Sequence, residues 1–201
     1  MHVINCEQLS PEWFTAKCGT PSASGFDKIV TSKCEPSKQA EKYLYQLAGE
    51  RITGIKEETH QTPAMARGVE MESEAKDLFR MIKEVEVKEV GLCYPDEDKR
   101  YLCSPDGILA SSQGLEIKCP LLHTQVKYLL DNKLPTDYVQ QVQGSMLVTG
   151  FQSWYFMSYY PGMPPLVIEV PRDDGFCAKL KVELDMFCDQ LDELETKLRR
   201  L

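Results

Sequence analysis

Cys103-Ser104-Pro105-Asp106-Gly107 and Gly114-Leu115-Glu116-Ile117-Lys118 are the two stretches that decide the fold class. Pro-Asp-Gly predicts a turn that leads into a short strand over 107–110. The second stretch alternates, so Leu115 and Ile117 share one face of a strand while Glu116 and Lys118 share the other. Two short strands joined in this way predict neighbouring strands of one sheet.

The polar residues of this pair of strands point to a metal site. An Asp-Gly turn and a surface ion pair would each explain one half of the pattern alone. Together, Asp106, Glu116 and Lys118 form Pro-Asp-x(9)-Glu-x-Lys. Two carboxylates on adjacent strands bind a hard divalent cation, and a lysine beside them orients or activates an attacking water. This combination is typical of metal-dependent nucleases.

Two flanking helices each carry a polar residue on an otherwise small or apolar face. Gly68, Glu72, Ala75, Phe79 and Ile82 recur at helical spacing within the helix predicted over 64–83. Burial of an unpaired carboxylate is costly, so Glu72 either faces a cation or a base or reaches water at the edge of this face. Gln141 lies on the same face as Tyr138, Ser145 and Val148. Its side chain either satisfies a backbone group or holds a water or phosphate oxygen.

The remaining pattern predicts a mixed α/β chain. Further helices are expected from Ser10-Pro11, over 24–32, over 37–52 with Gly54 as the stop, over 122–132 and over 136–148, with one long helix after Asp173. Further strands are expected within 85–94 and over 101–104, 153–160 and 166–170. Helices, then strands, then alternating elements predict a central mixed sheet flanked by helices.

Length and charge narrow the function classes. The chain has 201 residues and is 42% hydrophobic, which predicts one folded domain over 1–201. The N-terminus lacks the basic patch and apolar stretch of a signal peptide, and no apolar run is long enough to span a membrane. We therefore expect a cytoplasmic protein with no membrane partner and with its eight cysteines reduced. The net charge of −8 argues weakly against a nucleic-acid partner, although only the local charge matters at a binding site.

Five motifs in order along the chain resemble the YqaJ-type viral recombinase family of PD-(D/E)XK nucleases, to which the lambda-type exonucleases belong. They are Trp13, Lys17, Gly19 and Ser22-Ala23-Ser24; Gly68-x-x-x-Glu72-x-x-Ala75; the Asp106 and Glu116-x-Lys118 strands; Tyr138-Val139-Gln140-Gln141-Val142-Gln143; and Trp154-Tyr155-Phe156. Each motif is weak alone, but five in register over nearly the whole chain make chance a poor explanation.

The resemblance implies a restriction-endonuclease-like core with a central mixed sheet. It implies a Mg²⁺-dependent 5′-to-3′ exonuclease on linear double-stranded DNA, with two metal ions and Mn²⁺ as a substitute. Such enzymes release 5′ mononucleotides and leave 3′ single-stranded tails for a phage-type single-strand annealing protein. The resemblance also implies a homotrimeric ring around the DNA.

The same resemblance implies roles for individual residues. Asp106, Glu116 and the main-chain carbonyl of Ile117 would bind metal, Lys118 would position the nucleophilic water, and Glu72 and Gln141 would complete the catalytic site. The pocket for the 5′-phosphate and the terminal nucleotide would consist of Trp13, Lys17, Ser22, Ser24 and Ser104. Lys17 stands where the family often has arginine, so the charge is kept but the bidentate fork is lost.

Two alternatives remain open from the sequence. A site-specific or structure-specific PD-(D/E)XK endonuclease would use the same carboxylates but would not need a DNA end. A non-enzymatic DNA-binding relative would be expected to lose Glu116 or Lys118, and both are present.

Overall fold

The computed structural model describes residues 1–56 and 63–201. The helices are α1 Pro11–Lys17, η1 Ala23–Lys28, α2 Ala40–Thr53, α3 Pro63–Lys83, α4 Leu122–Asp131, η2 Thr136–Tyr138, α5 Val139–Thr149 and α6 Asp174–Leu198, where η denotes a 3₁₀ helix. The strands are β1 His2–Ile4, β2 Val87–Lys88, β3 Leu92–Tyr94, β4 Gly107–Leu109, β5 Gln113–Lys118, β6 Ser153–Ser158 and β7 Leu166–Pro171. No helix in these ranges is long and apolar enough to cross a membrane.

A five-stranded mixed sheet forms the centre of the molecule, with the strand order β2-β4-β5-β6-β7. The β5–β6 pair is parallel, and the other pairs are antiparallel. A parallel pair requires a long crossover, which α4, η2 and α5 supply between β5 and β6. The central position of β5 places Glu116 and Lys118 in the middle of the sheet. β1 and β3 form a separate two-stranded sheet.

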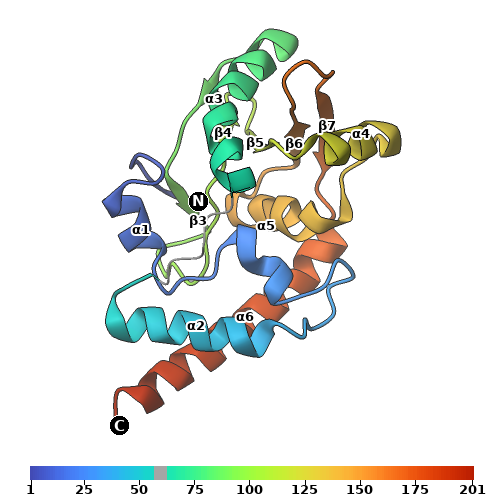
Figure 1. The fold of residues 1–201 in the computed structure, drawn as a ribbon. Coiled ribbons are helices and arrows are strands. Elements are labelled where there is room, and N and C mark those ends of the chain that lie inside the picture. Colours follow the sequence, from blue (N-terminus) through green and yellow to red (C-terminus); the bar gives the residue numbers. More distant parts are fainter. Residues whose placement is uncertain (57–62) are drawn as a thin grey trace.

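Helices cover the sheet in layers (Figure 1). Ala75 and Phe79 of α3 belong to a buried cluster with Leu115 and Ile117 of β5. On another part of the sheet, α5 packs against β6 and β7 through a buried cluster that includes Trp154 and Phe156. The largest cluster joins η1 and α2 to α6. The α3 and α5 helices therefore bring Glu72 and Gln141 to the two sides of β5.

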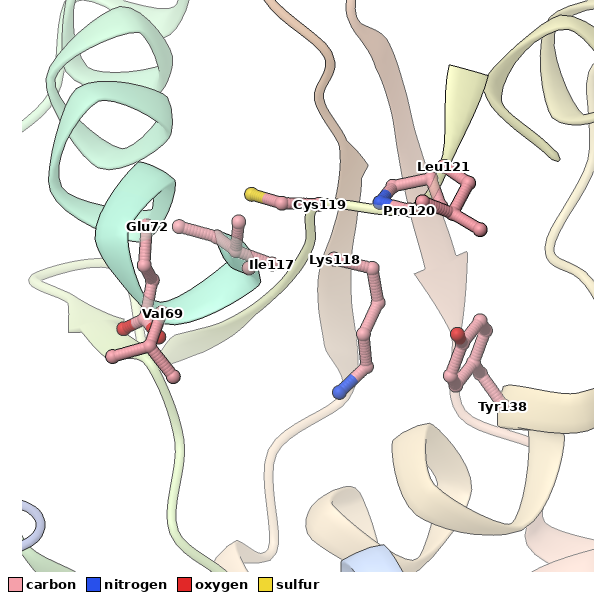
Figure 2. A pocket seen from close by; sticks show the side chains of 9 residues that line it. Val69, Glu72, Ile117, Lys118, Cys119, Pro120, Leu121 and Tyr138 are labelled. Carbon is pink, nitrogen blue, oxygen red and sulfur yellow. The ribbon is translucent and has the colours of Figure 1, made fainter. Parts of the chain in front are cut away.

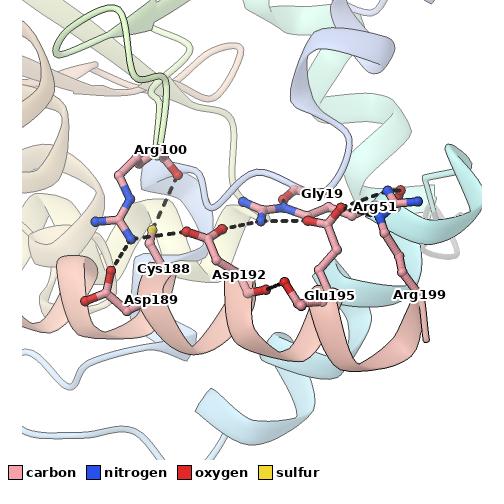
Figure 3. Close-up of polar contacts among 9 residues, drawn as sticks. Gly19, Arg51, Arg100, Cys188, Asp189, Asp192, Glu195 and Arg199 are labelled. Atoms are coloured by element: carbon pink, nitrogen blue, oxygen red, sulfur yellow. Dashed lines mark hydrogen bonds and ion pairs between the residues drawn. The ribbon is translucent and has the colours of Figure 1, made fainter. Parts of the chain in front are cut away.

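The C-terminal helix is fixed by apolar packing and by ion pairs (Figure 3). Leu180, Leu184 and Leu191 are fully buried, as expected for a helix packed on its own domain. Arg51 of α2 lies 2.6 Å from Asp192 and 3.1 Å from Glu195 on α6. The same guanidinium donates through Nε to the Gly19 carbonyl at 2.9 Å. Consequently α6 supports the loop after α1, which carries Ser22 and joins the two helices that carry Trp13, Lys17 and Ser24.

The predicted mixed α/β class, central mixed sheet and long C-terminal helix are confirmed. The strand expected over 101–104 is wrong. Leu102 forms a single bridge to Ser22, and Cys103 forms one to Cys93, so no ladder of strand pairing develops. Pro105, two residues further on, has no N–H to pair with a neighbouring strand. The helix expected over 24–32 is a 3₁₀ helix over Ala23–Lys28. Strand β1 was not expected. On α3, Ile82 is exposed, so the apolar face ends earlier than predicted.

Gly114 sets how closely β5 and β6 approach one another. A Cβ atom at Gly114 would lie 2.2 Å from the Trp154 ring, which is fully buried. We predict that Gly114→Ala destabilises the fold by about 1–3 kcal/mol through overpacking. Chemical denaturation monitored by circular dichroism measures this. Gly49→Ala is the matched control, because a Cβ at this helical position meets no atom within 4 Å. Equal losses in both variants would contradict the packing argument.

Candidate active site

Asp106 lies just before β4 and is held by the neighbouring strand β5. Its backbone N–H donates to the Leu115 carbonyl at 3.0 Å. Its Oδ2 accepts a hydrogen bond from the Ile117 N–H at 2.6 Å. Both partners belong to β5, so the neighbouring strand fixes the backbone and the side chain of Asp106. The expected pairing of the two motif strands is confirmed.

Glu116 is the most deeply buried of the polar residues predicted for the site, with 3% exposure. Its Oε1 accepts a hydrogen bond from Gln141 Nε2 at 2.6 Å and forms an ion pair with Lys118 Nζ, also at 2.6 Å. Gln141 therefore satisfies a side-chain carboxylate, which is a partner that the sequence did not specify. These contacts fix one oxygen of Glu116.

Negative charge is concentrated at this point. Burial and the nearby carboxylates of Glu116 and Glu72 raise the pKa of Asp106 well above its usual value. Burial alone would lower the pKa of Lys118, but attraction to Glu116 and Asp106 outweighs it and raises this pKa. Lys118 is therefore charged at neutral pH and balances one of the two carboxylates that it faces. The site favours an additional positive charge.

A cavity of about 170 Å³ joins these groups to the N-terminal motif. We call it the site cavity. Its polar or aromatic lining residues from the sequence prediction are Trp13, Lys17, Ser24, Ser104, Asp106, Glu116, Lys118 and Gln141. Gln8 and Ser145 also line it and were not predicted as site residues. Gln8 donates to the Pro105 carbonyl at 2.8 Å, so it supports the turn that carries Asp106.

Glu72 lies outside the site cavity. It lines an adjoining cavity of about 390 Å³ together with Ile117, Lys118 and Tyr138 (Figure 2). The Glu72 side chain is about one-third exposed and lies 3.7 Å from Lys76. Of the two alternatives for Glu72, the structure shows a carboxylate at the edge of its helix face that reaches water, because the turn of α3 that carries it borders an open cavity. Its carboxylate still acts on Asp106 through its charge.

The residues predicted to bind DNA fall into two adjoining groups. Trp13 Nε1 donates to Ser104 Oγ at 3.1 Å, so α1 is linked to the turn before Asp106. Lys17 Nζ lies 4.3 Å from the centre of the Trp13 ring, close enough for a cation–π interaction. The Ser22 and Ser24 hydroxyls lie 3.1 Å apart. Ser22 does not line the site cavity. It lines a neighbouring cavity that shares Lys17 and Ser24 with it.

The loop between Lys17 and Ser22 is clamped at Gly19. Glu50 accepts a hydrogen bond from the Gly19 N–H at 2.9 Å, while Arg51 binds the Gly19 carbonyl. Gly19 has a φ of +65°, and a Cβ atom there would lie 2.4 Å from the Arg51 side chain. Glycine is therefore required at this position. The clamp from α2 was not visible in the sequence, because its two residues lie about thirty positions away.

The donor set fits a hard divalent cation. Among the described residues, neither Asp106 Oδ1 nor Glu116 Oε2 accepts a hydrogen bond, so each carboxylate keeps one oxygen for another partner. Carboxylate and carbonyl oxygens are the ligands that Mg²⁺ prefers. No group of three or more His, Cys, Asp or Glu side chains in the described part is arranged around a metal. A cation here would rely on Asp106, Glu116, the Ile117 carbonyl and water.

Most of the chain matches one known protein family. The YqaJ-like viral recombinase domain family matches residues 12–152, which include the whole site cavity apart from its Gln8–Leu9 edge. The chain belongs to this family. No curated protein matches the chain with significance.

Solved structures agree with this YqaJ-like assignment. An alkaline exonuclease from Laribacter hongkongensis, LHK-Exo, is 29% identical, with a TM-score of 0.87 over 95% of this chain and 97% of that one. The complex of LHK-Exo with dAMP has a TM-score of 0.86 at the same identity and coverage. A phage-related exonuclease from Haemophilus somnus 129PT is 14% identical, with a TM-score of 0.71 over 89% of this chain and 96% of that one, and shows the fold alone. The YqaJ-like chain thus has the predicted PD-(D/E)XK-like fold.

Like-charge burial at Asp106 has a measurable consequence. Asp106→Asn keeps the shape and the hydrogen bond from Ile117 but removes one buried negative charge. In EDTA we predict that the variant melts a few degrees above the unmodified protein, since about 1 kcal/mol corresponds to about 2–4 °C at this size. Mg²⁺ should raise the Tm of the unmodified protein and leave that of the variant unchanged. Thermal melts with and without Mg²⁺ test both statements; an equal Mg²⁺ effect on both proteins would contradict the cation site.

Proposed function

We propose that this YqaJ-family chain is a Mg²⁺-dependent exonuclease that degrades one strand of linear double-stranded DNA in the 5′-to-3′ direction. The observation that carries the proposal is the site cavity, where Asp106, Glu116, Lys118 and Gln141 lie together with Trp13, Lys17 and Ser24. Family membership and the 29% identical alkaline exonuclease support a nuclease of this kind.

The chemistry follows from the charges of the site. Hydrolysis forms a bond between water oxygen and phosphorus and breaks the bond from phosphorus to the 3′ oxygen. The released nucleotide keeps its 5′-phosphate, the shortened strand carries a new 5′-phosphate, and a water proton reaches the leaving 3′ oxygen. A divalent cation held by Asp106, Glu116 and the Ile117 carbonyl would stabilise charge on the phosphate and make water more acidic. We propose that two such ions bind. Mn²⁺ would substitute for Mg²⁺, because it has the same ligand preferences.

The chain's own residues position the reactants. Lys118 is held by Glu116 with its ammonium group at the junction of the site cavity and the Tyr138-lined cavity. There it donates hydrogen bonds to the attacking water and to a phosphate oxygen. Gln141 keeps Glu116 in place, and Glu72 adds negative charge near the water from the far side. These roles are placement and electrostatic stabilisation.

The proposal extends to partners. A 3′ single-stranded tail would be the substrate of a phage-type annealing protein, and a homotrimeric ring would keep the enzyme on its DNA. We propose a cytoplasmic site of action, because double-stranded DNA ends are the substrate.

End-labelled linear duplex separates this function from its alternative. We predict that the protein releases 5′ mononucleotides from linear duplex in Mg²⁺ or Mn²⁺ and releases nothing in EDTA. Covalently closed circular duplex should remain intact, because an exonuclease needs an end. Asp106→Ala and Glu116→Ala should abolish release while DNA binding, measured by fluorescence anisotropy, persists. Cutting of the closed circle would favour the endonuclease instead. Turnover by either variant at saturating Mg²⁺ would contradict the metal assignment.

Lys118 tests the water-positioning role. Lys118→Met keeps much of the side-chain length but removes the charge. We predict that kcat falls by about two to four orders of magnitude, the usual range for loss of a positioned proton-transfer or hydrogen-bonding group. Calorimetric titration should show that Mg²⁺ still binds. Lys127→Met is the matched control, since Lys127 is exposed on α4 and lines neither cavity described above. Loss of Mg²⁺ binding in Lys118→Met would assign Lys118 to the structure of the site.

A further inference from the structure

Two cysteines face one another where the segment before the Asp106 turn pairs with β3. Cys93 and Cys103 form an antiparallel bridge in which each N–H donates to the carbonyl of the other residue, at 2.8 and 2.9 Å. Directly opposite residues of an antiparallel pair place their side chains on the same face. Both side chains are buried in one apolar cluster, with exposures of 0% and 1%. The two thiols are therefore neighbours, although they lie ten positions apart in the sequence.

The backbone spacing of this pair suits a disulfide. The Cα atoms of a hydrogen-bonded antiparallel pair lie about 5.5 Å apart, within the range of about 4.4–6.8 Å that disulfides span. All eight cysteines are free thiols. In the strand pairs and single bridges of the described residues, no other cysteine lies opposite a cysteine. Cys93 and Cys103 are thus the pair that the backbone brings into register for a bond.

Cys93 is the more acidic of the two thiols. A hydrogen bond from the Cys103 thiol lowers the pKa of Cys93, and this effect outweighs burial. Burial raises the pKa of each of the other seven cysteines. Because the thiolate is the nucleophile, the more acidic member of the pair reacts first with an oxidant. Cys103, still protonated beside it, is placed to close the bond.

The thiol pair lies beside the site cavity. Ser104, which follows Cys103 in the chain, lines that cavity, and so does Ser145, which hydrogen-bonds to the Cys103 thiol. One layer of side chains therefore separates a molecule in the site cavity from the two thiols. Hydrogen peroxide is only one oxygen atom larger than water, so it is small enough to enter a cavity of about 170 Å³.

We propose that Cys93 and Cys103 form a site of reversible oxidation, at which a hydroperoxide converts the two thiols into a disulfide. The Cys93 thiolate attacks one peroxide oxygen, the O–O bond breaks, and the other oxygen leaves as water or an alcohol with the proton that Cys93 gave up. Cys93 is then a sulfenic acid. The Cys103 sulfur attacks the Cys93 sulfur, the S–O bond breaks, and the Cys103 proton leaves with that oxygen as water. The two thiols lose two electrons, and the peroxide gains them.

Oxidation at this site would act on the nuclease through the Asp106 turn, and this part rests on the proposed function. A disulfide holds its sulfur atoms about 2.05 Å apart, closer than two thiols in contact. Ser104 is tied to the segment that carries Cys93, since its hydroxyl donates to the Gly91 carbonyl at 2.7 Å. A shift of Cys103 is therefore passed on to Ser104 and to Asp106. We expect the disulfide form to be slower by about 10- to 100-fold, because small displacements of catalytic groups have effects of this size.

Peptide mapping tests the site without catalysis. The reduced protein is treated with hydrogen peroxide in EDTA, denatured, alkylated and digested with trypsin. Trypsin cuts after Lys99 and Arg100, so the two cysteines fall in separate peptides, over 89–99 and 101–118. We expect a disulfide-linked product of these two peptides, and we expect dithiothreitol to remove it.

Matched variants show whether the bond is specific. Cys93→Ser and Cys103→Ser should each abolish the linked product. Cys188→Ser is the control and should form it to the same extent as the unmodified protein. Cys188 is as buried as Cys103, but its thiol donates to the Arg100 carbonyl at 3.4 Å. Circular dichroism confirms the fold of each variant, and Cys93→Ala or Cys103→Ala replaces a serine variant that does not fold.

The outcomes separate this proposal from the nuclease assignment. Linked peptides in the unmodified protein and in Cys188→Ser, with none in Cys93→Ser, would support the site even if no DNA were degraded. Their absence at peroxide concentrations that oxidise the half-buried Cys119 would overturn it, even in an active nuclease.

Rates on linear duplex test the effect on the active site. Peroxide should slow the unmodified protein and Cys188→Ser by about 10- to 100-fold and leave Cys93→Ser unchanged, and dithiothreitol should restore the rate. An equal loss in Cys93→Ser would overturn the link between the disulfide and the Asp106 turn.

Discussion

The carboxylates of Asp106, just before β4, and of Glu116, on β5, lie side by side, and Lys118 balances only one of the two negative charges. Glu116 is almost fully buried, and Asp106 is held by the backbone of the same strand. Such an arrangement is unfavourable unless every oxygen has a partner. The strand pairing of β4 with β5, the return of Lys118 onto Glu116 and the approach of Gln141 from α5 each satisfy part of this requirement. What remains, one free oxygen on each carboxylate and an excess of negative charge, is what a hard cation would satisfy.

The same constraint bears on the residues proposed to bind the substrate, which come from the N-terminal part of the chain. The sheet supplies acceptors, and an anionic substrate also needs donors. α1 and the loop that follows it provide them, and they are held by contacts far away in sequence. Glu50 and Arg51 clamp Gly19 from both sides, while Arg51 is itself fixed by Asp192 and Glu195 of α6 (Figure 3). The long C-terminal helix therefore contributes to the site, although none of its residues lines the cavities described here.

Much of the fold and of the site could be predicted because local pattern and chemistry coincide in this chain. Alternation over 114–118 set the face of Glu116, and Asp-Gly set the turn before β4. Helical spacing predicted that Gln141 faces the core, but its partner Glu116 could not be predicted because that residue lies on a different element, β5, twenty-five positions away. Helical spacing left two positions open for Glu72, and the cavity that its turn of α3 borders, whose other wall comes from Pro120 and Tyr138, decides between them. The strand expected over 101–104 was lost to two single bridges, which depend on neighbours from two distant segments. In each case the deciding contact is a long-range one, which periodicity does not encode.

Net charge was the weakest guide to function, and the structure shows why. An excess of eight acidic groups suggests repulsion of DNA, but the field at a site depends on which charges are neutralised nearby. Several cations away from the cavities are paired with carboxylates of α6, as Arg51 and Arg100 are. Lys17, Lys28 and Lys56 form no such pair among the described residues. They line one cavity with Glu50, whose carboxylate accepts hydrogen bonds from Gly19 and Gln46, and Lys17 also lines the site cavity with Asp106 and Glu116. An acidic net charge and a local group of cations are therefore compatible, because carboxylates of α6 pair with Arg51 and Arg100, whereas the three lysines form no such pair among the described residues.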